Sequence, residues 1–201
     1  MTAATGNRIR CGWIDQSRLS PGDFELYRDY HDNEWGRPLR GSVALFERVS
    51  LEAFQSGLSW LIILRKRDNF RTAFDGFDVE RVAQYSARDV ERLMADAGIV
   101  RNRPKIEATI SNARIVADLA DEGVDFGELL WSFAPEDRLT RARPADLSQL
   151  APVTPESTAM AKELKGRGFR FVGPTTAYAL MQATGMVDDH VANCWVPRTF
   201  G

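Results

Sequence analysis

Apolar residues recur at intervals of three and four along most of this chain, which is the repeat of one face of an α-helix. The repeat is clearest after Ser42, where the segment 43–54 carries Leu45, Phe46 and Val49. The same pattern, together with capping residues, predicts further helices over residues 60–70, 87–97, 104–117, 155–165 and 174–184. No long alternating run of β-branched residues occurs, so we expect an all-α fold without a sheet.

Capping signals mark several of these boundaries. Ser59 is placed to cap the second helix, and Ser86 with Asp89 forms the capping box of the third. Pro104 fits the first turn of the fourth helix, where its missing N–H group is not needed. Four prolines fall within residues 134–155, a segment that we interpret as an ordered loop between helical lobes.

Length and composition indicate a folded globular protein. The 201 residues are 44% apolar and 27% charged, which is enough to bury a core. We expect residues 1–9 to form a flexible tail and residues 10–201 to form a single two-lobed helical unit. No apolar stretch approaches the roughly 20 residues that span a bilayer, and the first residues lack the apolar run of a secretory signal, so we expect a cytoplasmic protein without membrane contact. The net charge is −2, so any nucleic-acid binding must depend on a local basic patch.

The two cysteines and two histidines of the chain form two pairs near its ends, Cys11 with His31 and His190 with Cys194. His190 and Cys194 are four residues apart, so on a helix they would project from one face, with about 6 Å between their Cβ atoms. Cys11 and His31 would complete a Cys2His2 set, which zinc binds as a tetrahedron. Four protein ligands leave no open position, so we expect one structural zinc ion per chain, joining the N-terminal segment to a C-terminal helix.

Two other interpretations of these residues stay open. Lone histidines are often surface or hydrogen-bonded core residues, and buried cysteines often behave as small hydrophobic residues. A disulfide between Cys11 and Cys194 would also join the two ends of the chain, although nothing in the sequence indicates an oxidising compartment.

The segment 165–190 combines glycines with basic residues. We expect one helix to end at Gly166 or Gly168 and the next to begin at Gly173 and Pro174. The glycines of such a hairpin let the backbone approach a partner closely, and the free N–H groups at the second helix can bind a phosphate. Basic side chains gather in the same region, at Lys162, Lys165, Arg167 and Arg170. Ordinary helix connections also use glycine, so this segment does not by itself establish DNA contact.

Glu52 flanks the apolar face of the helix predicted over residues 43–54. Most glutamates in such a position reach solvent at the edge of the helix. A surplus of aromatic residues near it in the sequence favours a pocket instead: Trp13, Tyr27, Tyr30, Trp35 and Trp60. Aromatic residues are more often core, yet an aromatic cage with one carboxylate suits a flat cationic heterocycle, through stacking, cation–π attraction and a charge-assisted hydrogen bond.

Seven segments of the chain, in the same order, closely resemble the bacterial 3-methyladenine DNA glycosylase I family of helix-hairpin-helix glycosylases. They are CGW from Cys11, YHDNEWG from Tyr30, LEAFQSGLSW from Leu51, DAGIVRNRPKIEATISNAR from Asp96, WSF from Trp131, RGFRFVGPTTAY from Arg167 and DDHVANC from Asp188. The resemblance extends from about Arg10 to Arg198. It implies a two-lobed, all-helical helix-hairpin-helix DNA glycosylase fold, with a zinc site that joins the terminal segments through the two Cys/His pairs.

The resemblance also implies a function for the pocket. Glu52 would be the catalytic residue, with Tyr30 and Trp60 binding the extruded base and Trp13, Tyr27 and Trp35 around them. The DNA-binding residues would be the wedge Leu58 with its neighbour Gly57, and Arg167, Gly168, Arg170 and Gly173 of the hairpin. The partner would be double-stranded DNA with alkylated bases, the product 3-methyladenine, and the protein a monomer.

Two positions bear on the mechanism that the resemblance implies. Asp188 stands where this family commonly has asparagine and where other helix-hairpin-helix glycosylases have an aspartate. It would orient water or stabilise the sugar cation, or it would cap a helix carrying His190; we favour the cap. Bifunctional glycosylases use a lysine at the position of Thr175, so we expect a monofunctional hydrolase. The alternative function is a non-catalytic, zinc-stapled helical DNA-binding module, which would not need Glu52 beside tryptophans.

Overall fold

Helices joined by turns and irregular loops account for the fold in the computed structural model, which describes residues 8–198. These residues contain no strand, so the all-α prediction is confirmed for them. The α-helices are α1 (Pro21–Asn33), α2 (Ser42–Gln55), α3 (Trp60–Ala73), α4 (Val79–Ala83), α5 (Ala87–Ala95), α6 (Arg103–Asp121), α7 (Phe126–Trp131), α8 (Pro155–Gly166) and α9 (Pro174–Ala183). Short 3-10 helices lie at Gln16–Arg18 (η1), Asp75–Phe77 (η2) and Leu147–Gln149 (η3).

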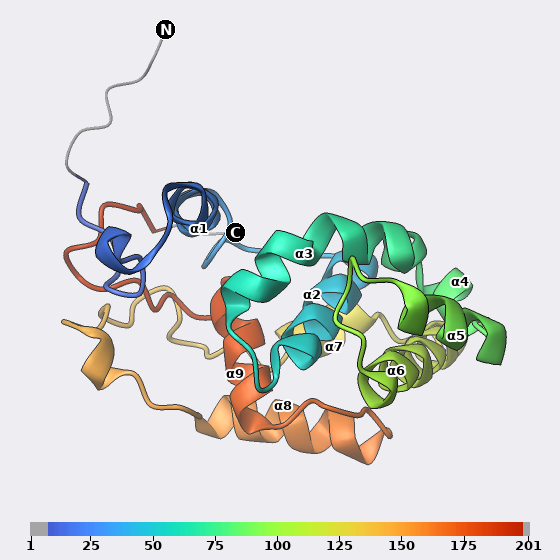
Figure 1. The fold of residues 1–201 in the computed structure, drawn as a ribbon. Coiled ribbons are helices and arrows are strands. Elements are labelled where there is room, and N and C mark those ends of the chain that lie inside the picture. The colour runs from blue at the N-terminus through green and yellow to red at the C-terminus, as the bar shows by residue number, and fades with distance from the viewer. Residues whose placement is uncertain (1–7, 199–201) are drawn as a thin grey trace, which may run out of the picture.

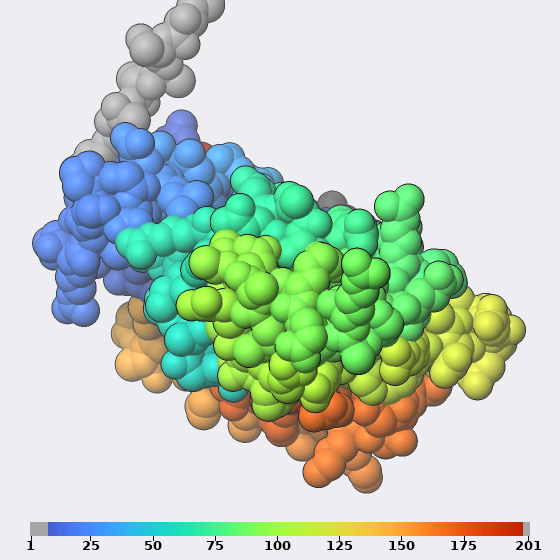
Figure 2. Space-filling model, turned by 45° about the vertical axis from the view of Figure 1, so that its right-hand side comes forward, coloured from blue at the N-terminus to red at the C-terminus, as the bar shows by residue number. Residues whose placement is uncertain are grey.

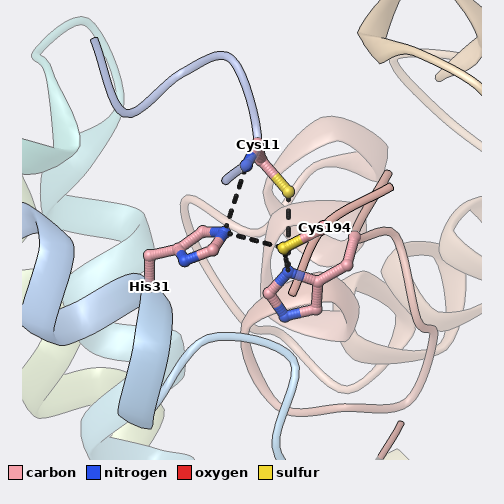
Figure 3. Close-up of side chains that lie close together, drawn as sticks. Cys11, His31 and Cys194 are labelled. Atoms are coloured by element: carbon pink, nitrogen blue, oxygen red, sulfur yellow. Dashed lines mark hydrogen bonds between the residues drawn. The ribbon is translucent and has the colours of Figure 1, made fainter. Parts of the chain in front are cut away.

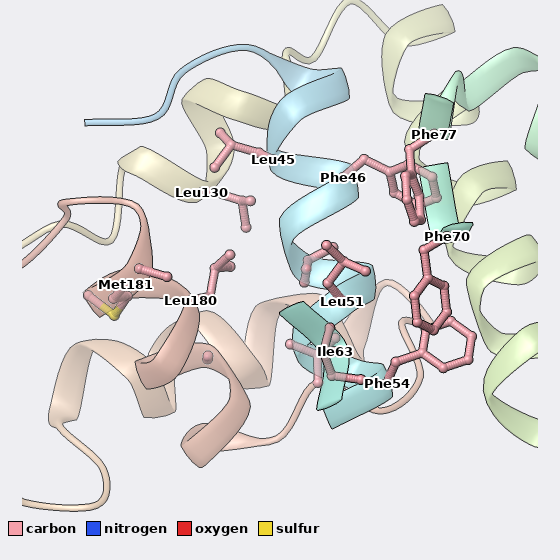
Figure 4. Packing of buried hydrophobic residues seen from close by; sticks show 14 of the residues in the cluster. Leu45, Phe46, Leu51, Phe54, Ile63, Phe70, Phe77, Leu130, Leu180 and Met181 are labelled. Carbon is pink, nitrogen blue, oxygen red and sulfur yellow. The ribbon is translucent and has the colours of Figure 1, made fainter. Parts of the chain in front are cut away.

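Helix α2 runs through the middle of the molecule and contacts α3, α6, α7 and α9 (Figure 1). A helix with neighbours on all sides is buried around its whole circumference, and every residue of α2 from Leu45 to Phe54, except Glu47, is buried. Figure 4 shows its two sides. Leu45 lies near Leu130, whereas Phe54 lies near Phe70. The polar residue Glu52 is therefore carried into the interior by the helix that forms the centre of the core.

A cluster of phenylalanines holds α2 against α3 and η2 (Figure 4). The rings of Phe54 and Phe70 lie with centroids 4.7 Å apart, and those of Phe74 and Phe77 lie 5.3 Å apart and nearly parallel. All four side chains are fully buried, and each buried aromatic ring of this size stabilises the fold by about 2 to 3 kcal/mol. In the space-filling view the segments from α3 to α6 form one continuous face, with α8 along its lower edge (Figure 2).

The two terminal segments lie side by side next to α1, at the opposite end of the molecule from α4 and α5 (Figure 1). The Trp195 backbone N–H donates to the Ile9 carbonyl at 2.9 Å. The Arg8 guanidinium lies over the Trp195 ring, 3.8 Å from its centroid. The predicted flexible tail was residues 1–9. Its residues 1–7 lie outside the described residues, and Arg8 and Ile9 make the contacts just given.

The predicted helices are present as α2, α3, α5, α6, α8 and α9, with small changes at their ends. The Ser86 and Asp89 capping box forms as expected. Ser59 occupies the N-cap position of α3, although its side chain makes no capping bond. Residues 134–154 form an irregular loop containing only η3, as the prolines of the segment predicted, and the last residue of the predicted loop, Pro155, begins α8.

Helix α1 was not predicted, although Ser20 and Pro21 give a sequence signal for its start. Ser20 accepts a hydrogen bond from the Asp23 N–H, and Pro21 occupies the first turn, a combination that favours helix initiation. The short helices α4 and α7 were also not predicted. Among residues 8–198 no helix is long and apolar enough to cross a membrane.

The prediction that His190 and Cys194 project from a helix is wrong. Helix α9 ends at Ala183, and residues 187–198 form turns and extended backbone without a helix. Gly185 adopts a φ of +71°, and a Cβ atom there would lie 2.7 Å from the Arg37 and Pro38 backbone, so only glycine allows this close approach. The chain leaves α9 at this point, and a spacing of four residues is instead bridged by a turn, in which the Cys194 N–H donates to Val191 O.

Candidate functional site

A cavity of about 350 Å³ opens between α1, the facing ends of α2 and α3, α9, and the loop that contains η3. It is lined by Trp13, Tyr27, Tyr30, Trp35, Glu52, Gln55, Trp60, Leu147, Leu150, Ala179, Gln182 and Ala183. All five aromatic residues singled out in the sequence, and Glu52, therefore meet around one space, here called the aromatic cavity. Its volume is within the range of small-molecule sites, at the lower end.

The aromatic rings form a continuous wall. Trp13 packs edge-on against Tyr27 and Trp35, with ring centroids 5.0 and 5.3 Å apart, and Tyr30 lies 5.5 Å from Trp60. Tyr30, Trp35 and Trp60 are buried, whereas Trp13 and Tyr27 are half-buried at the mouth. Such edge-to-face packing fixes the rings in place and leaves flat faces available for a planar ligand.

Glu52 is the unusual member of this wall. It is 5% exposed, and no residue of the described chain donates a hydrogen bond to its carboxylate. Burial raises the pKa of Glu52 to about 7, while the nearby Arg48 guanidinium opposes this shift. The Glu52 oxygens are not among the fully enclosed polar atoms that lack a partner, so they face the cavity, where they can accept hydrogen bonds from a ligand that brings both a donor and a positive charge.

Arg48 connects Glu52 to the aromatic wall. Its guanidinium donates to the Tyr30 hydroxyl at 3.0 Å and lies 5.1 Å from the centroid of the Trp60 ring. It is 4.0 Å from Glu34, which forms a two-point ion pair with Arg67. Burial raises the pKa of the Tyr30 phenol, so Tyr30 remains protonated and, while it accepts from Arg48, can donate its own proton into the cavity.

Cys11, His31, His190 and Cys194 come together as a second buried group, here called the Cys/His cluster, whose ligand atoms all lie within 4.8 Å of one another. Figure 3 shows the side chains of Cys11, His31 and Cys194 pointing toward a common centre. The His190 Nδ1 atom lies 3.5 Å from both sulfur atoms, and His31 Nε2 lies 3.6 Å from the Cys194 sulfur. Ligands of a tetrahedral zinc ion are separated by about 3.3 to 3.8 Å, given zinc bonds of roughly 2.0 to 2.3 Å. The donor set is one that zinc binds, and the three donor distances just given lie within this range.

The far nitrogen of each histidine faces an oxygen atom. His31 Nδ1 lies 2.8 Å from an Asp32 carboxylate oxygen, and His190 Nε2 lies 3.1 Å from the Trp35 carbonyl. Arg10 in turn pairs with Asp32 at 2.7 Å. Partners of this kind orient metal-binding histidines and select the nitrogen that faces the metal. Both cysteines are buried free thiols, so the structure does not contain the disulfide that was considered as an alternative.

The predicted DNA-binding residues lie on two exposed turns. Gly57, with a φ of +81°, precedes Leu58, whose side chain is 38% exposed between α2 and α3. The turn between α8 and α9 carries exposed Arg167, Gly168, Arg170 and Gly173. Gly168 has a φ of +96°, which favours glycine. The turn also contains Phe171, which is 39% exposed at a φ of +59°, a conformation that an aromatic residue rarely adopts.

The prediction that Asp188 caps a helix carrying His190 is wrong, because residues 189–198 contain no helix. One of its oxygens instead accepts from Arg143 at 2.8 Å and lies 3.5 Å from Arg198. Asp188 does not line the aromatic cavity. Thr175 lies exposed in the first turn of α9.

Several lining residues were not identified from the sequence. Leu147 and Leu150 come from the proline-rich loop, and no local pattern brings that loop to the cavity. Gln182 is different, because a polar residue in a largely apolar helix is a usable signal. Its side-chain amide donates to Asp189 at 2.8 Å.

A family model described as methyladenine glycosylase matches residues 21–197. The chain belongs to the methyladenine glycosylase family. It is similar to DNA-3-methyladenine glycosylase 1 of Escherichia coli (strain K12), with 46% identity over 92% of this chain and 95% of that protein. A crystal structure of a 3-methyladenine DNA glycosylase I superposes with a TM-score of 0.85 at 45% identity, covering 93% of this chain and 98% of the other.

Another family structure is a variant of 3-methyladenine DNA glycosylase I in complex with 3-methyladenine. It superposes with a TM-score of 0.84 at 33% identity, covering 95% of this chain and 99% of the other. The resemblance to this family in the sequence is thereby confirmed, and the all-helical architecture of this member agrees with it.

Proposed function

We propose that this protein is a DNA glycosylase that extrudes 3-methyladenine from double-stranded DNA and hydrolyses its N-glycosidic bond, leaving an abasic site. Family membership and the relatives named for this activity support the reaction. The observation that carries it to this chain is Glu52, a buried carboxylate without a donor in an aromatic cavity. A flat base with a positive charge and N–H groups at its edge supplies what that carboxylate lacks.

The chemical properties of the methylated base make binding, rather than proton transfer, the main task of such a site. Methylation at N3 gives adenine a positive charge, so its bond to the sugar is already weak and the base leaves as a neutral molecule. Little proton transfer to the leaving group is needed. The enzyme must extrude the nucleotide from the helix and hold it, and water then attacks the sugar carbon.

We assign the residues of the aromatic cavity as follows. Glu52 accepts hydrogen bonds from the edge of the base and stabilises its charge until the bond breaks. Tyr30 and Trp60, at the inner end, stack on the base or hydrogen-bond to it, and Trp13, Tyr27 and Trp35 complete the cage. A neutral purine of similar shape gains stacking but not the charge interaction, so the carboxylate favours the methylated base over normal adenine.

We assign DNA contact to the two exposed turns. Leu58 would fill the gap that the extruded nucleotide leaves, a use of apolar side chains that other DNA-bending proteins share. The α8–α9 turn would be the helix-hairpin-helix element, where Arg167 and Arg170 contact phosphates and the glycines allow the backbone to approach the duplex. Because Thr175 has no amine with which to form a Schiff base, the reaction would stop at hydrolysis.

We infer that the Cys/His cluster binds one zinc ion through Cys11, His31, His190 and Cys194. The convergence of the four donor atoms within 4.8 Å and the oriented histidines support this. Four protein ligands leave no position for water or substrate, so the ion would supply no chemistry and would stabilise the terminal segments. We also expect a monomeric protein located in the cytoplasm.

The proposed function is tested by the release of free base. Duplex DNA treated with a methylating agent would be incubated with the protein, and the released bases separated and quantified. We expect free 3-methyladenine and abasic sites, without strand cleavage, and we expect this release to persist for a time after a chelator is added. Binding to DNA without release of any base would support the alternative of a non-catalytic DNA-binding module.

A further inference from the structure

Two buried polar residues of α6 hold the backbones of two exposed turns that lie far apart in the sequence. Lys105 is 7% exposed, and its ammonium group donates to the carbonyls of Phe54 and Ser56 at 2.9 and 2.5 Å. Asn112 is 2% exposed, and its side-chain amide donates to the Arg170 carbonyl at 3.1 Å while its oxygen accepts from the Arg170 N–H at 2.9 Å. The partners of both side chains are main-chain atoms outside α6.

Lys105 acts at the turn that presents Leu58, here called the wedge loop (residues 56–59). Helix α2 ends at Gln55, and the last carbonyls of a helix lack intrahelical partners and carry partial negative charge. The Lys105 ammonium satisfies one carbonyl before the end of the helix and one after it. It therefore fixes the direction in which the chain leaves α2, while the backbone at Gly57, with a φ of +81°, turns Leu58 outward.

Asn112 acts at the α8–α9 turn, here called the hairpin (residues 167–173). Its two hydrogen bonds bind both main-chain groups of one residue, Arg170, much as a neighbouring strand would. Phe171, the next residue, is held exposed at a φ of +59°. Such a conformation persists only where the surrounding structure determines it, and the bonds from Asn112 supply part of that restraint.

The two side chains are seven residues apart in one uninterrupted helix. A separation of seven places them on the same face, two turns and about 10 Å apart along the axis. A single rigid element thus sets the position of the wedge loop relative to the hairpin. Flipping a nucleotide requires a few kcal/mol, and that energy is available only if both turns engage the same duplex at once.

We propose that Lys105 and Asn112 are positioning residues that hold the wedge loop and the hairpin at the spacing needed to open a DNA duplex. This inference depends on the proposed function, since it assigns both turns to DNA. It separates duplex opening, which needs the spacing, from base recognition in the aromatic cavity, to which neither residue contributes a lining atom.

The test compares Lys105→Met and Asn112→Leu, which keep side-chain volume but remove the bonds to the loops. Thr109→Val is the matched control. Thr109 lies between them on α6, is 2% exposed, and donates only to the Lys105 carbonyl of its own helix at 3.0 Å. Each variant would be assayed below its unfolding temperature for excision from duplex DNA, for opening of the base pair reported by a fluorescent base beside the lesion, and for binding of free 3-methyladenine.

We expect Lys105→Met and Asn112→Leu to lose about tenfold or more in duplex excision and in base opening, with affinity for free 3-methyladenine unchanged. Thr109→Val should retain all three properties, even if it unfolds at a lower temperature. If excision by the three variants merely follows their unfolding temperatures, or if the loop variants also lose 3-methyladenine binding, the positioning role is wrong.

If Asn112→Leu does not fold, Asn112→Asp supplies the second variant, since it keeps the acceptor for the Arg170 N–H and loses the donor. Normal duplex opening by that variant and by Lys105→Met would overturn the inference. The wild-type protein tests the proposed function separately. If the wild-type protein released no base from methylated DNA, the proposed function itself would fail. If the wild-type protein and both variants were fully active, only the positioning role would be rejected.

Discussion

The aromatic cavity and the Cys/His cluster are neighbouring groups of buried polar and aromatic residues. They differ in whether their polar atoms have partners within the protein. Trp35 belongs to both, because its ring lines the cavity and its carbonyl lies 3.1 Å from His190. In the cluster, each ligand atom lies within 3.4 to 3.6 Å of a polar atom from another cluster residue. In the cavity, the Glu52 carboxylate lacks a donor and the buried Trp60 indole N–H lacks an acceptor among the described residues.

This difference separates a structural group from a recognition group. The cluster is enclosed by its own ligands and has space for one small ion. The cavity has space for a planar ring and has a charge that the protein does not neutralise by direct contact. Buried polar groups without partners are rare in folded proteins, and those that persist are candidates for ligand binding. Removing a residue from the cluster should therefore affect stability, whereas removing one from the cavity should affect activity.

The largest effect is expected at the cluster, from Cys194→Ser. Loss of a soft thiolate ligand would weaken the proposed metal site, and a metal bound there would close a loop of nearly the whole chain, so stability should fall on the order of several kcal/mol. Metal content and chemical denaturation would be measured together. If the variant lost all of its metal but kept its stability, the distinction between a structural cluster and a recognition cavity would be wrong. The same would follow if the freshly purified wild-type protein contained no zinc.

Trp60→Ala tests the cavity, where the expected change is in activity and not in metal content. Base–aromatic stacking contributes roughly 1 to 3 kcal/mol, so excision should fall by about tenfold to a hundredfold. Single-turnover excision of 3-methyladenine measures this loss, and metal content should stay unchanged. Loss of the metal from this variant would show that the two regions are not independent.

The pH dependence of excision sharpens the assignment of Glu52. Its pKa is raised to about 7 by burial, and the charged form is the one that stabilises a cationic base, so excision should fall as pH drops below about 7, toward tenfold per unit. The contribution of the same group to stability has the opposite sign, because a raised carboxyl pKa favours the folded state at low pH and this advantage is lost as pH rises through about 7. Rate and unfolding profiles on one buffer series would check both signs, and a flat rate profile in this range would contradict the assignment.

The smallest effect is expected at the hairpin. Arg167→Ala or Arg170→Ala should weaken binding to all duplexes alike and reduce the slope of log affinity against log salt by about one for each phosphate contact. Arg167 already pairs with Glu163 at 2.7 Å, so its loss should have less effect than that of Arg170. Fluorescence titrations at several salt concentrations would measure this, and unchanged slopes in both variants would place the DNA surface elsewhere.

Local patterns predicted the fold more completely than the site. The capping box at Ser86 and the proline at position 104 determine local backbone geometry, so the helices α5 and α6 were predictable. Helix α1 was not, because its sequence is mostly polar and its few apolar residues form only a weak helical repeat. His190 and Cys194 show a further limit: a spacing of four suits a helix, yet a turn brings the same two atoms to the same centre.

The burial of Glu52 lay beyond local patterns altogether. A glutamate at the edge of an apolar face ordinarily reaches solvent, and its exposure here depends on α1, α9 and the η3 loop closing over the end of α2. Helix α1 precedes α2 in the chain, whereas η3 begins at Leu147 and α9 at Pro174, far beyond the end of α2 at Gln55, and no local repeat encodes contacts between such distant segments. The family resemblance identified the residue, and the geometry gives the physical reason for its effect.

The most direct test of this account is single-turnover excision of 3-methyladenine by Glu52→Gln, with thermal unfolding measured in parallel and Asp188→Asn as the matched control. Glu52→Gln preserves shape but removes the charge and one acceptor, so excision should fall by about tenfold to a hundredfold while the fold remains. Asp188 pairs with Arg143 outside the cavity, so its amide variant should excise nearly normally. Near-normal excision by Glu52→Gln, with a large loss in Asp188→Asn, would contradict the account and assign the chemistry to the aspartate.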